Sequence, residues 1–157
     1  MPQKKFIGFF LVFFSALLLL YQTGKAPISS FITWPFILFF IASLLVFIGF
    51  IKENAQLVLI AGIAASVGLF IWGMQNIINW PTHWSILIVM FGIVIFLHYL
   101  VSKHHLAISV AIILILSGLC AWPGLRDVSV LAPIAPLLNT YWPVFILGLG
   151  IYFLFRK

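Results

Sequence analysis

The sequence predicts an all-α membrane protein with six transmembrane helices, and three observations lead to this fold class. First, 65% of the 157 residues are apolar and only 6% are charged, a balance that a water-soluble domain cannot bury. Second, the chain offers about six apolar stretches near the length of about 20 residues that a helix needs to cross a bilayer. Third, a backbone in lipid must satisfy its own polar groups, so a spanning segment is either a helix or a strand of a closed barrel. These stretches lack the alternating apolar and polar residues of barrel strands.

The expected helices occupy residues 6–23, 33–51, 55–73, 83–101, 106–122 and 140–155. The first stretch follows two lysines but lacks the small-x-small pattern of a cleaved signal peptide, so we expect it to be kept as a signal-anchor helix. The single cysteine, Cys120, excludes an internal disulfide and offers no CxxC metal or redox site.

The eight lysines and arginines predict the topology. With the N-terminus in the cytoplasm, only Lys25 and Arg126 fall outside. The remaining six fall inside: Lys4, Lys5, Lys52, Lys103, Arg156 and Lys157. This asymmetry predicts that both termini are cytoplasmic. The same cations meet anionic headgroups, so membrane lipid is an expected partner and nucleic acid is not.

The chain also repeats itself. Tryptophans begin the second, fourth and sixth expected helices: Trp34, Trp84 and Trp142. Eight residues later each of these helices has a small residue: Ala42, Gly92 and Gly150. In the odd helices serines recur at a constant spacing: Ser15, Ser66 and Ser117. We therefore predict one transmembrane domain of three helical hairpins, at about 1–53, 54–104 and 105–157, which are parallel repeats.

Small residues within the spans predict close helix packing, because glycine and alanine let two backbones approach where no solvent-driven effect holds helices together. We expect those of the even helices to face the partner helix of each hairpin or the bundle centre. The third helix adds two small-xxx-small pairs, which predicts a central, closely packed element. The candidate packing residues are Ala42, Gly92, Gly150, Gly62, Ser66 and Gly68.

All six tryptophans, Trp72 among them, lie at predicted outer helix ends. An interfacial aromatic belt is the ordinary interpretation, but a two-sided belt would also place tryptophan near Lys52 or Lys103. The one-sided pattern leaves an outer groove or partner surface as the alternative. The candidate residues of that outer face are Trp34, Trp84, Trp142, Trp122, Arg126 and Asp127.

The stretch "WPGLRDVSVLAPIAPLLNTYWP" from Trp122 to Pro143 holds four prolines and should form a short interfacial helix or re-entrant piece on the outer face. Proline also suits the first turn of a helix, as after Trp34 and Trp142. Thr33 and Thr140 precede these Trp-Pro pairs and could cap both helices by accepting from free N–H groups.

These segments resemble a known family. "WPFILFFIASLLVFIGF" from Trp34 and "WPVFILGLGIYFLF" from Trp142 begin with Trp-Pro and continue as an apolar helix with a small residue about two turns in. "HWSILIVMFGIVIFLHYL" from His83 fits less closely, since Ser85 stands where proline would. The pattern is similar to that of the LiaI/LiaF-like transmembrane region. The resemblance implies a bacterial membrane protein connected with cell-envelope stress and the regulation of sensor kinases.

The sequence offers few polar groups that could converge for catalysis. Glu53 is expected inside and Asp127 outside, so the two acids cannot pair. His98, His104 and His105 gather near the inner face with no acid or cysteine ligand on a matching helix face, other than Glu53 across the bundle. No phosphate loop, dinucleotide motif or activated nucleophile is present. We expect no enzyme, no metal and no cofactor.

The sequence thus favours a non-enzymatic, multi-pass protein of the bacterial cytoplasmic membrane. We expect it to act through helix contacts with another integral membrane protein, as an accessory or regulatory subunit in cell-envelope homeostasis or stress response, with a homo-oligomer left open. The alternative is a small carrier or scramblase for a lipid or polyprenyl-linked substrate, which the tryptophan-lined outer face favours. A hollow groove from the outer rim toward Ser66 would favour transport, and a filled bundle centre would favour partner binding.

Overall fold

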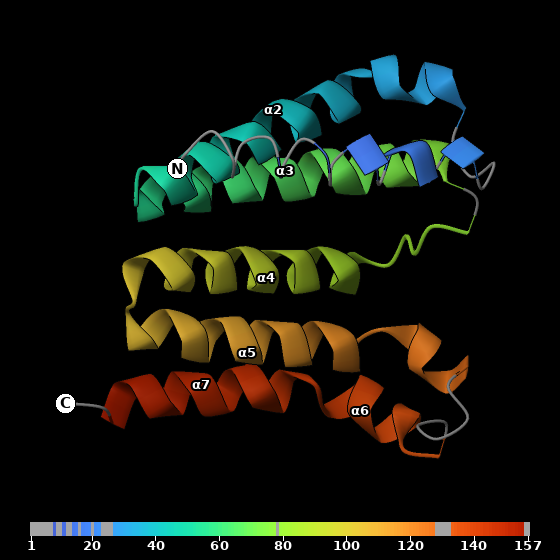
Figure 1. Cartoon of the computed structure of the whole chain (residues 1–157). Coiled ribbons are helices and arrows are strands. Elements are labelled where there is room, and N and C mark those ends of the chain that lie inside the picture. Colours follow the sequence, from blue (N-terminus) through green and yellow to red (C-terminus); the bar gives the residue numbers. More distant parts are fainter. Residues whose placement is uncertain are drawn as a thin grey trace. The chain divides into compact units, whose positions relative to one another are not determined.

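A computed structural model of the chain describes residues 8, 11, 14–15, 17–19, 21–22, 27–77, 79–127 and 133–155. The described residues form helices and no strand (Figure 1). The long helices are α2 (Trp34–Ile51), α3 (Ala55–Asn76), α4 (Trp84–Ser102) and α5 (His105–Cys120). The shorter elements are two 3-10 helices, η1 (Ile28–Ile32) and η2 (Pro123–Asp127), and the helices α6 (Ala135–Tyr141) and α7 (Pro143–Phe155).

Three of these helices are long and apolar enough to cross a membrane: α2, α3 and α4, with 18, 22 and 19 residues. α5 is also apolar but has 16 residues, which rise about 24 Å against a hydrocarbon core of about 30 Å. The all-helical fold and the presence of helices able to span a membrane are therefore confirmed. The six spans and the three hairpin repeats remain predictions.

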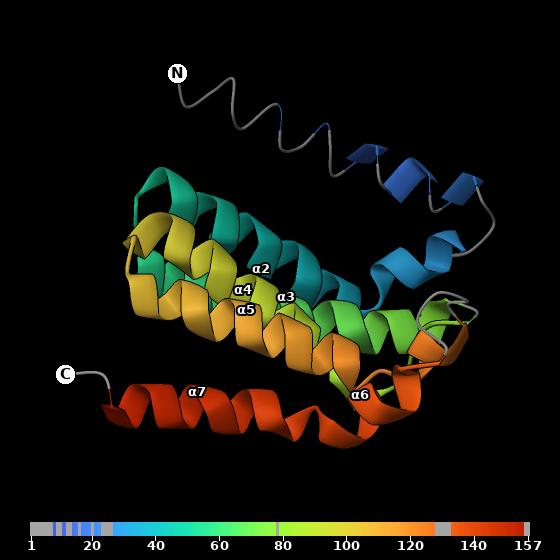
Figure 2. The ribbon, with the colours of Figure 1, turned by 90° about the horizontal axis from the view of Figure 1, so that it is seen from below.

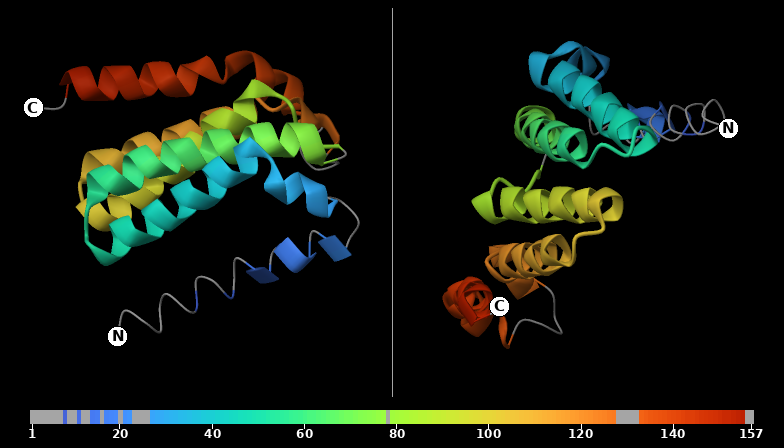
Figure 3. Two further views of the ribbon diagram at one scale, coloured as in Figure 1. Left: turned by 90° about the horizontal axis from the view of Figure 1, so that it is seen from above. Right: turned by 90° about the vertical axis from the view of Figure 1, so that its left-hand side faces the viewer.

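The chain forms two compact units, unit 1 at residues 1–80 and unit 2 at residues 81–157. In unit 1, α2 and α3 pack side by side as an antiparallel pair (Figures 1 and 2). In unit 2, α4 and α5 form a second such pair, and α5 lies between α4 and α7 (Figure 3). Each pair joins the last helix of one predicted hairpin to the first helix of the next, so the closest packing crosses the predicted repeat boundaries.

The two pairs share one structural plan at a constant offset along the sequence. The step from Trp34 to Trp84, which begin α2 and α4, equals the step from Ala55 to His105, which begin α3 and α5. The connecting turns match as well, because Glu53 and Lys103 both have a left-handed backbone, with φ of 53° and 55°. The step between the two serines, Ser66 and Ser117, is one position longer, so these serines are not structurally equivalent.

The structure confirms the predicted proline in the first turn of α2 but not the predicted threonine caps. Pro35 lies in the first turn of α2, as its missing N–H favours. Neither threonine caps a helix: Thr33 Oγ1 donates to the Ser30 carbonyl at 2.7 Å, and Thr140 lies inside α6 and donates to the Pro136 carbonyl at 2.9 Å. Thr33 bonds to the helix before it and Thr140 to the helix that contains it, each to a carbonyl three or four residues earlier. Such a local bond occupies the hydroxyl and so competes with helix capping.

The proline-rich stretch after α5 contains η2 and α6, so the expected short helix exists. Residues 128–132 of this stretch lie outside the described residues. The helix expected at 140–155 is divided at Trp142, where α6 ends and α7 starts with Pro143. A proline cannot donate to the preceding turn, which explains a break at this point.

Candidate functional site

In unit 1, α3 approaches α2 to backbone contact at Gly68. A Cβ on this residue would lie 2.8 Å from the Phe39 amide nitrogen and 2.9 Å from the Pro35 carbonyl oxygen. Backbone atoms cannot rotate aside as a side chain can, so this position admits glycine and little else. The contact fixes the distance between the two helices at the end where α2 begins.

Unit 2 has the same contact at the matching place. A Cβ on Gly118 of α5 would lie 2.9 Å from the Ser85 carbonyl oxygen and 3.0 Å from the Val89 amide nitrogen of α4. Further along the pair, a Cβ on Gly92 would lie 3.0 Å from the Ile115 amide nitrogen. The α4–α5 pair is therefore held close at two separate places along its length.

The other packing candidates divide into buried and open positions. Ala42 and Ser66 are 3% and 7% exposed, and Ser66 Oγ donates to the carbonyl of the buried Gly62 at 2.9 Å. Gly150 of α7 is exposed, and apart from its chain neighbours and the backbone of its own helix no described atom lies within 4 Å of the place that its Cβ would occupy. The packing partner expected for Gly150 is therefore absent from the described part of unit 2.

Trp72 lies in the core of unit 1 and not in the aromatic belt that the sequence favours. Its side chain is 2% exposed, and its Nε1 donates to the Ser30 carbonyl at 2.8 Å. Its ring lies 5.5 Å from that of Phe36 and 5.7 Å from that of Phe31, so an aromatic cluster joins η1, α2 and α3. Sequence reasoning missed this because a tryptophan near a helix end looks the same whether it faces lipid or a neighbouring helix. Trp34, by contrast, is 62% exposed.

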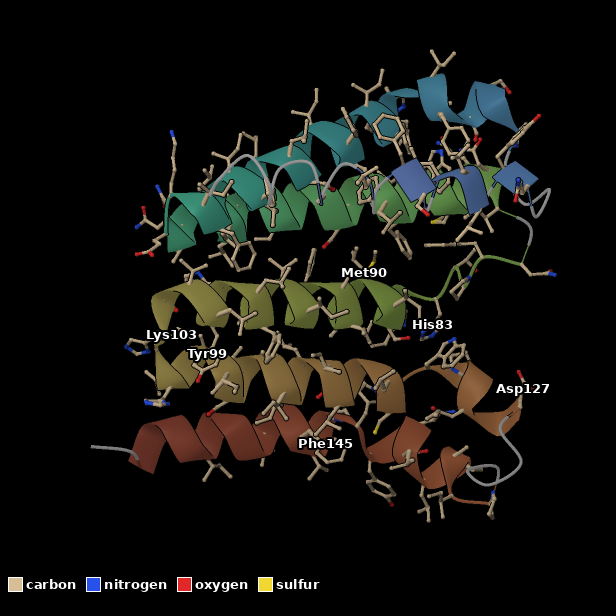
Figure 4. The ribbon with its side chains drawn as sticks, viewed as in Figure 1. His83, Met90, Tyr99, Lys103, Asp127 and Phe145 are labelled. Carbon is tan, nitrogen blue, oxygen red and sulfur yellow. The ribbon has the colours of Figure 1, made fainter. Side chains whose placement is uncertain are left out.

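In unit 2, two of the outer-face candidates come together. The rings of Trp84 and Trp142 lie 5.2 Å apart, and the His83 ring lies 5.2 Å from that of Trp84. These three residues, the aromatic row, stand at the start of α4 and of α7. Figure 4 shows His83 at the same end of unit 2 as Asp127, with Lys103 at the opposite end of α4.

His83 and Ser85 form a pair that resembles a nucleophile beside a base. Ser85 Oγ and His83 Nδ1 are 2.7 Å apart, and the Ser85 amide donates to the same nitrogen at 3.3 Å. Nδ1 is thus the acceptor that caps α4, in the position where an aspartate or serine is commoner. Ser85 is completely buried against α5, so its hydroxyl has no approach for a substrate. The pair is a helix cap.

The remaining outer-face candidates lie in η2 or directly before it. The Trp122 ring covers Gly124, Asp127 is exposed, and the side chain of Arg126 lies outside the described residues. With its amide nitrogen turned toward α5, Asn139 donates to the Cys120 carbonyl at 2.6 Å and to the Trp122 carbonyl at 3.2 Å. Asn139 therefore ties α6 to the end of α5. The only hint in the sequence is a polar residue within an apolar stretch.

An apolar hollow of about 350 Å³ lies where α6 meets α7. Phe145, labelled in Figure 4, forms part of its wall. The lining residues are Leu137, Leu138, Tyr141, Val144 and Phe145. This hollow could take a hydrocarbon chain. Ser66, toward which a hollow groove would have favoured transport, is buried in the α2–α3 pair.

His104 and His105 are exposed at the α4–α5 turn, where the His105 ring lies 6.5 Å from that of Tyr99. Among the described residues, no three histidine, cysteine, aspartate or glutamate side chains come together in a way that could hold a metal ion.

Comparison of the chain with protein-family models, with curated protein sequences and with solved structures gives no match. The LiaI/LiaF-like resemblance therefore stays a prediction.

Proposed function

We propose that this chain is a non-enzymatic integral membrane protein that acts through helix contacts with another membrane protein, as an accessory or regulatory subunit in bacterial cell-envelope homeostasis or stress response. The observation that carries the proposal is the repeated glycine-to-backbone contact, Gly68 on Pro35 in unit 1 and Gly118 on Ser85 in unit 2. Such contacts make each helix pair a stiff element with a fixed outer surface.

The exposed side of α2 carries a ridge of apolar side chains suited to docking against another helix. Ile37, Ile41 and Leu45 are 47%, 51% and 39% exposed and follow one another at a spacing of four residues. Residues at this spacing form a ridge, and a ridge packs into the groove between two ridges of a neighbouring helix. A ridge carried by a stiff pair loses little conformational entropy on docking, which favours a specific helix partner.

The cellular part of the proposal rests on the sequence. The Trp-Pro helices that resemble the LiaI/LiaF-like region support a role at the bacterial cell envelope. The distribution of lysine and arginine supports a multi-pass topology with both termini in the cytoplasm. Contacts with lipid headgroups accompany this arrangement.

The test is purification of the tagged chain from its own membranes in mild detergent, with quantification of the membrane proteins that accompany it. The same partner should accompany the unchanged chain and the variant Ile32→Ala, which removes an exposed isoleucine outside the ridge. Its recovery should fall about tenfold with Ile37→Ala/Ile41→Ala, because a loss of about 1.4 kcal/mol, less than the cost of truncating one hot-spot residue at the centre of an interface, weakens binding by that factor. Recovery of the chain alone, with bound phospholipid or polyprenyl phosphate, would contradict the proposal.

The cellular role has a separate test. Deletion of the gene should change the response of an envelope-stress reporter, and the unchanged chain should restore it. An identical reporter response in the presence and absence of the chain would remove the regulatory role even if a partner is found.

A carrier or scramblase of lipid or polyprenyl-linked substrates is the second candidate, and the hollow at the α6–α7 junction favours it. The exposed Tyr141 lines this hollow. Trp142 of the aromatic row directly follows Tyr141 and precedes α7. The purified chain in vesicles would then move a fluorescent lipid analogue between leaflets faster than protein-free vesicles do. Leu138→Trp, which fills the hollow, should slow that movement, and equal rates with and without protein would exclude this candidate.

A further inference from the structure

The start of α4 differs from the matching start of α2 by a titratable group. At the offset that relates the two pairs, His83 and Ser85 of unit 2 stand where Thr33 and Pro35 stand in unit 1. Proline has no N–H, so the first turn of α2 lacks this donor and needs no acceptor for it. Ser85 adds an amide donor and a hydroxyl donor at the same place in α4.

Both donors of Ser85 are directed at a single atom, Nδ1 of His83. The hydroxyl oxygen lies 2.7 Å from this nitrogen and the amide nitrogen lies 3.3 Å from it. Ser85 is completely buried, and no other described residue gives its hydroxyl a hydrogen-bond partner. An imidazole nitrogen accepts a hydrogen bond only while it carries no proton. The cap of α4 therefore depends on the neutral form of His83.

A proton on Nδ1 would reverse the hydrogen bond between His83 and Ser85. The imidazolium would donate to the hydroxyl oxygen, so the hydroxyl hydrogen and the amide N–H of a buried residue would both lose their acceptor. A buried donor without an acceptor costs more free energy than an ordinary hydrogen bond contributes. A cation at the N-terminus of a helix is also disfavoured by the helix dipole. Both effects oppose the capped arrangement once His83 is charged.

Few other titratable side chains surround this end of unit 2. Within its described part, α5 ends at Cys120, α6 ends at Tyr141, and Asp127 of η2 lies at the same end as His83 (Figure 4). The side chain of Arg126 lies outside the described residues. Thiol, phenol and carboxyl groups ordinarily keep one charge state between about pH 5.5 and 7.5, where histidine changes its charge. Histidine is therefore the side chain at this end that responds to mild acid.

Two contacts of unit 2 depend on the position of the first turn of α4. The Ser85 carbonyl oxygen would lie 2.9 Å from a Cβ on Gly118, and the Trp84 ring lies 5.2 Å from that of Trp142. The first contact joins α4 to α5, and the second joins α4 to the junction of α6 with α7. The Trp84 ring attracts an imidazolium with or without the cap, because His83 is its neighbour in sequence.

We propose that His83 is an acid-sensitive cap, whose protonation releases the first turn of α4 and loosens the contacts of Gly118 with Ser85 and of Trp84 with Trp142. The neutral form holds the capped arrangement, so its stabilisation is present at neutral pH and is lost as acid protonates the imidazole. In the multi-pass topology proposed above, on which this last step alone rests, His83 faces outward and the chain responds to acid outside the cell.

The first test measures hydrogen exchange of the Ser85 amide by NMR, in the full chain in detergent, at about pH 7.5 and about pH 5.5. Comparison with an unfolded peptide at the same pH removes the direct effect of pH on exchange. Protection of this amide should fall about fivefold or more on acidification. A factor of five corresponds to about 1 kcal/mol, the lower end of the cost of an unpaired buried donor.

His83→Asn is the matched variant for this test. Asparagine caps a helix without titrating, as Asn54 does at α3, and the other three histidines stay in place. Protection of the Ser85 amide in this variant should change by less than about twofold between the two pH values. An equal fall in the unchanged chain and in the variant would overturn the proposal, because another group would then be responsible. Constant protection in the unchanged chain would overturn it as well.

Ser85→Ala is the second variant, which keeps the amide bond to His83 and removes the hydroxyl bond. Its fall in protection on acidification should be smaller than that of the unchanged chain, because one donor fewer loses its acceptor. A fall as large as that of the unchanged chain would contradict the reversed hydrogen bond on which the proposal depends.

The second test follows the contact between Trp84 and Trp142 by fluorine NMR of the chain labelled with fluorotryptophan. Trp84→Phe and Trp142→Phe identify the two resonances, and the buried Trp72 of unit 1 is the internal control. Acidification should shift both resonances in the unchanged chain and neither in His83→Asn. A shift confined to Trp84 would show that the proton leaves the contact closed, which would overturn the proposed loosening. Because the whole sample has one pH, neither test depends on topology or on a partner protein.

Discussion

Gly118 of α5 lies against the carbonyl oxygen of Ser85 in α4, where an added Cβ would come within 2.9 Å. Gly68 of α3 lies against the carbonyl of Pro35 in α2 at the same 2.9 Å. The two contacts occupy matching places on both helices of each pair. Both contacts form although the residue that glycine meets is Pro35 in α2 and Ser85 in α4. The reason is that the backbone carbonyl group, and not the side chain, makes the contact.

Gly68→Ala should destabilise unit 1. The new methyl would overlap backbone atoms of α2, and overpacking of this kind costs about 1–3 kcal/mol, more than the roughly 1 kcal/mol that alanine gains in a helix. Unfolding of the purified chain by titration with a denaturing detergent would measure the loss. Gly148→Ala, at an open position, is the control and should leave the stability equal or slightly higher. A stabilised Gly68→Ala chain would show that α2 and α3 are not in contact there.

Gly92→Ala and Ile115→Ala should compensate each other. A Cβ at Gly92 would lie 2.7 Å from Ile115 Cγ1, whereas in unit 1 the equivalent places are held by Ala42 and Ala65. Gly92→Ala alone should therefore cost about 1–3 kcal/mol, and the pair should recover about 1 kcal/mol or more relative to the sum of the single effects. A double-mutant cycle of unfolding free energies measures this coupling. Strict additivity would mean that the two residues do not share the contact.

Trp72→Phe should destabilise the aromatic cluster of unit 1. It keeps most of the ring but removes the indole donor to the buried Ser30 carbonyl, which still accepts from the Thr33 hydroxyl, so the loss should be that of one hydrogen bond, about 0.5–1.5 kcal/mol. Trp34→Phe is the matched control, because this exposed side chain should change the unfolding free energy by no more than about 0.5 kcal/mol. Equal effects of the two substitutions would place Trp72 at the surface.

His104→Asn should stabilise α5. The equivalent residue in unit 1 is Asn54, whose Oδ1 accepts from the Leu57 amide at 3.0 Å and caps α3, whereas the His104 side chain makes no cap bond. Both residues have an extended backbone, so asparagine fits the new site and should add about 0.5–1 kcal/mol. Asn54→Ala should remove a similar amount from unit 1. The neighbouring variant His105→Asn serves as control, and a gain as large as that of His104→Asn would contradict capping as the cause.

Much of the fold could be predicted from the sequence because its signals are local. Tryptophan marks the start of α2 and α4, and proline marks the first turn of α2, as expected. The expected threonine caps failed, since each hydroxyl found a nearer carbonyl. At α4, for which no cap was predicted, the capping residue is His83, which no preference for common capping residues would have indicated.

The candidate site could be predicted only in part. As small residues within apolar helices, Gly68 and Gly92 are predicted to pack, and both lie in helix contacts. The same reasoning predicts packing at Gly150, which lies open. A glycine in an apolar helix signals that a backbone can approach, but the sequence does not state which backbone does so.

The sequence by itself determined that the chain forms apolar helices long enough to cross a membrane, and about where they begin. Those properties follow from composition and from the need of each backbone group for a partner within its own helix. Only the tertiary structure decided that α2 pairs with α3 and α4 with α5, and that Trp72 is buried while Trp34 is exposed. These outcomes depend on contacts between residues tens of positions apart, such as Trp72 with Ser30, and on shape complementarity that no single helix contains.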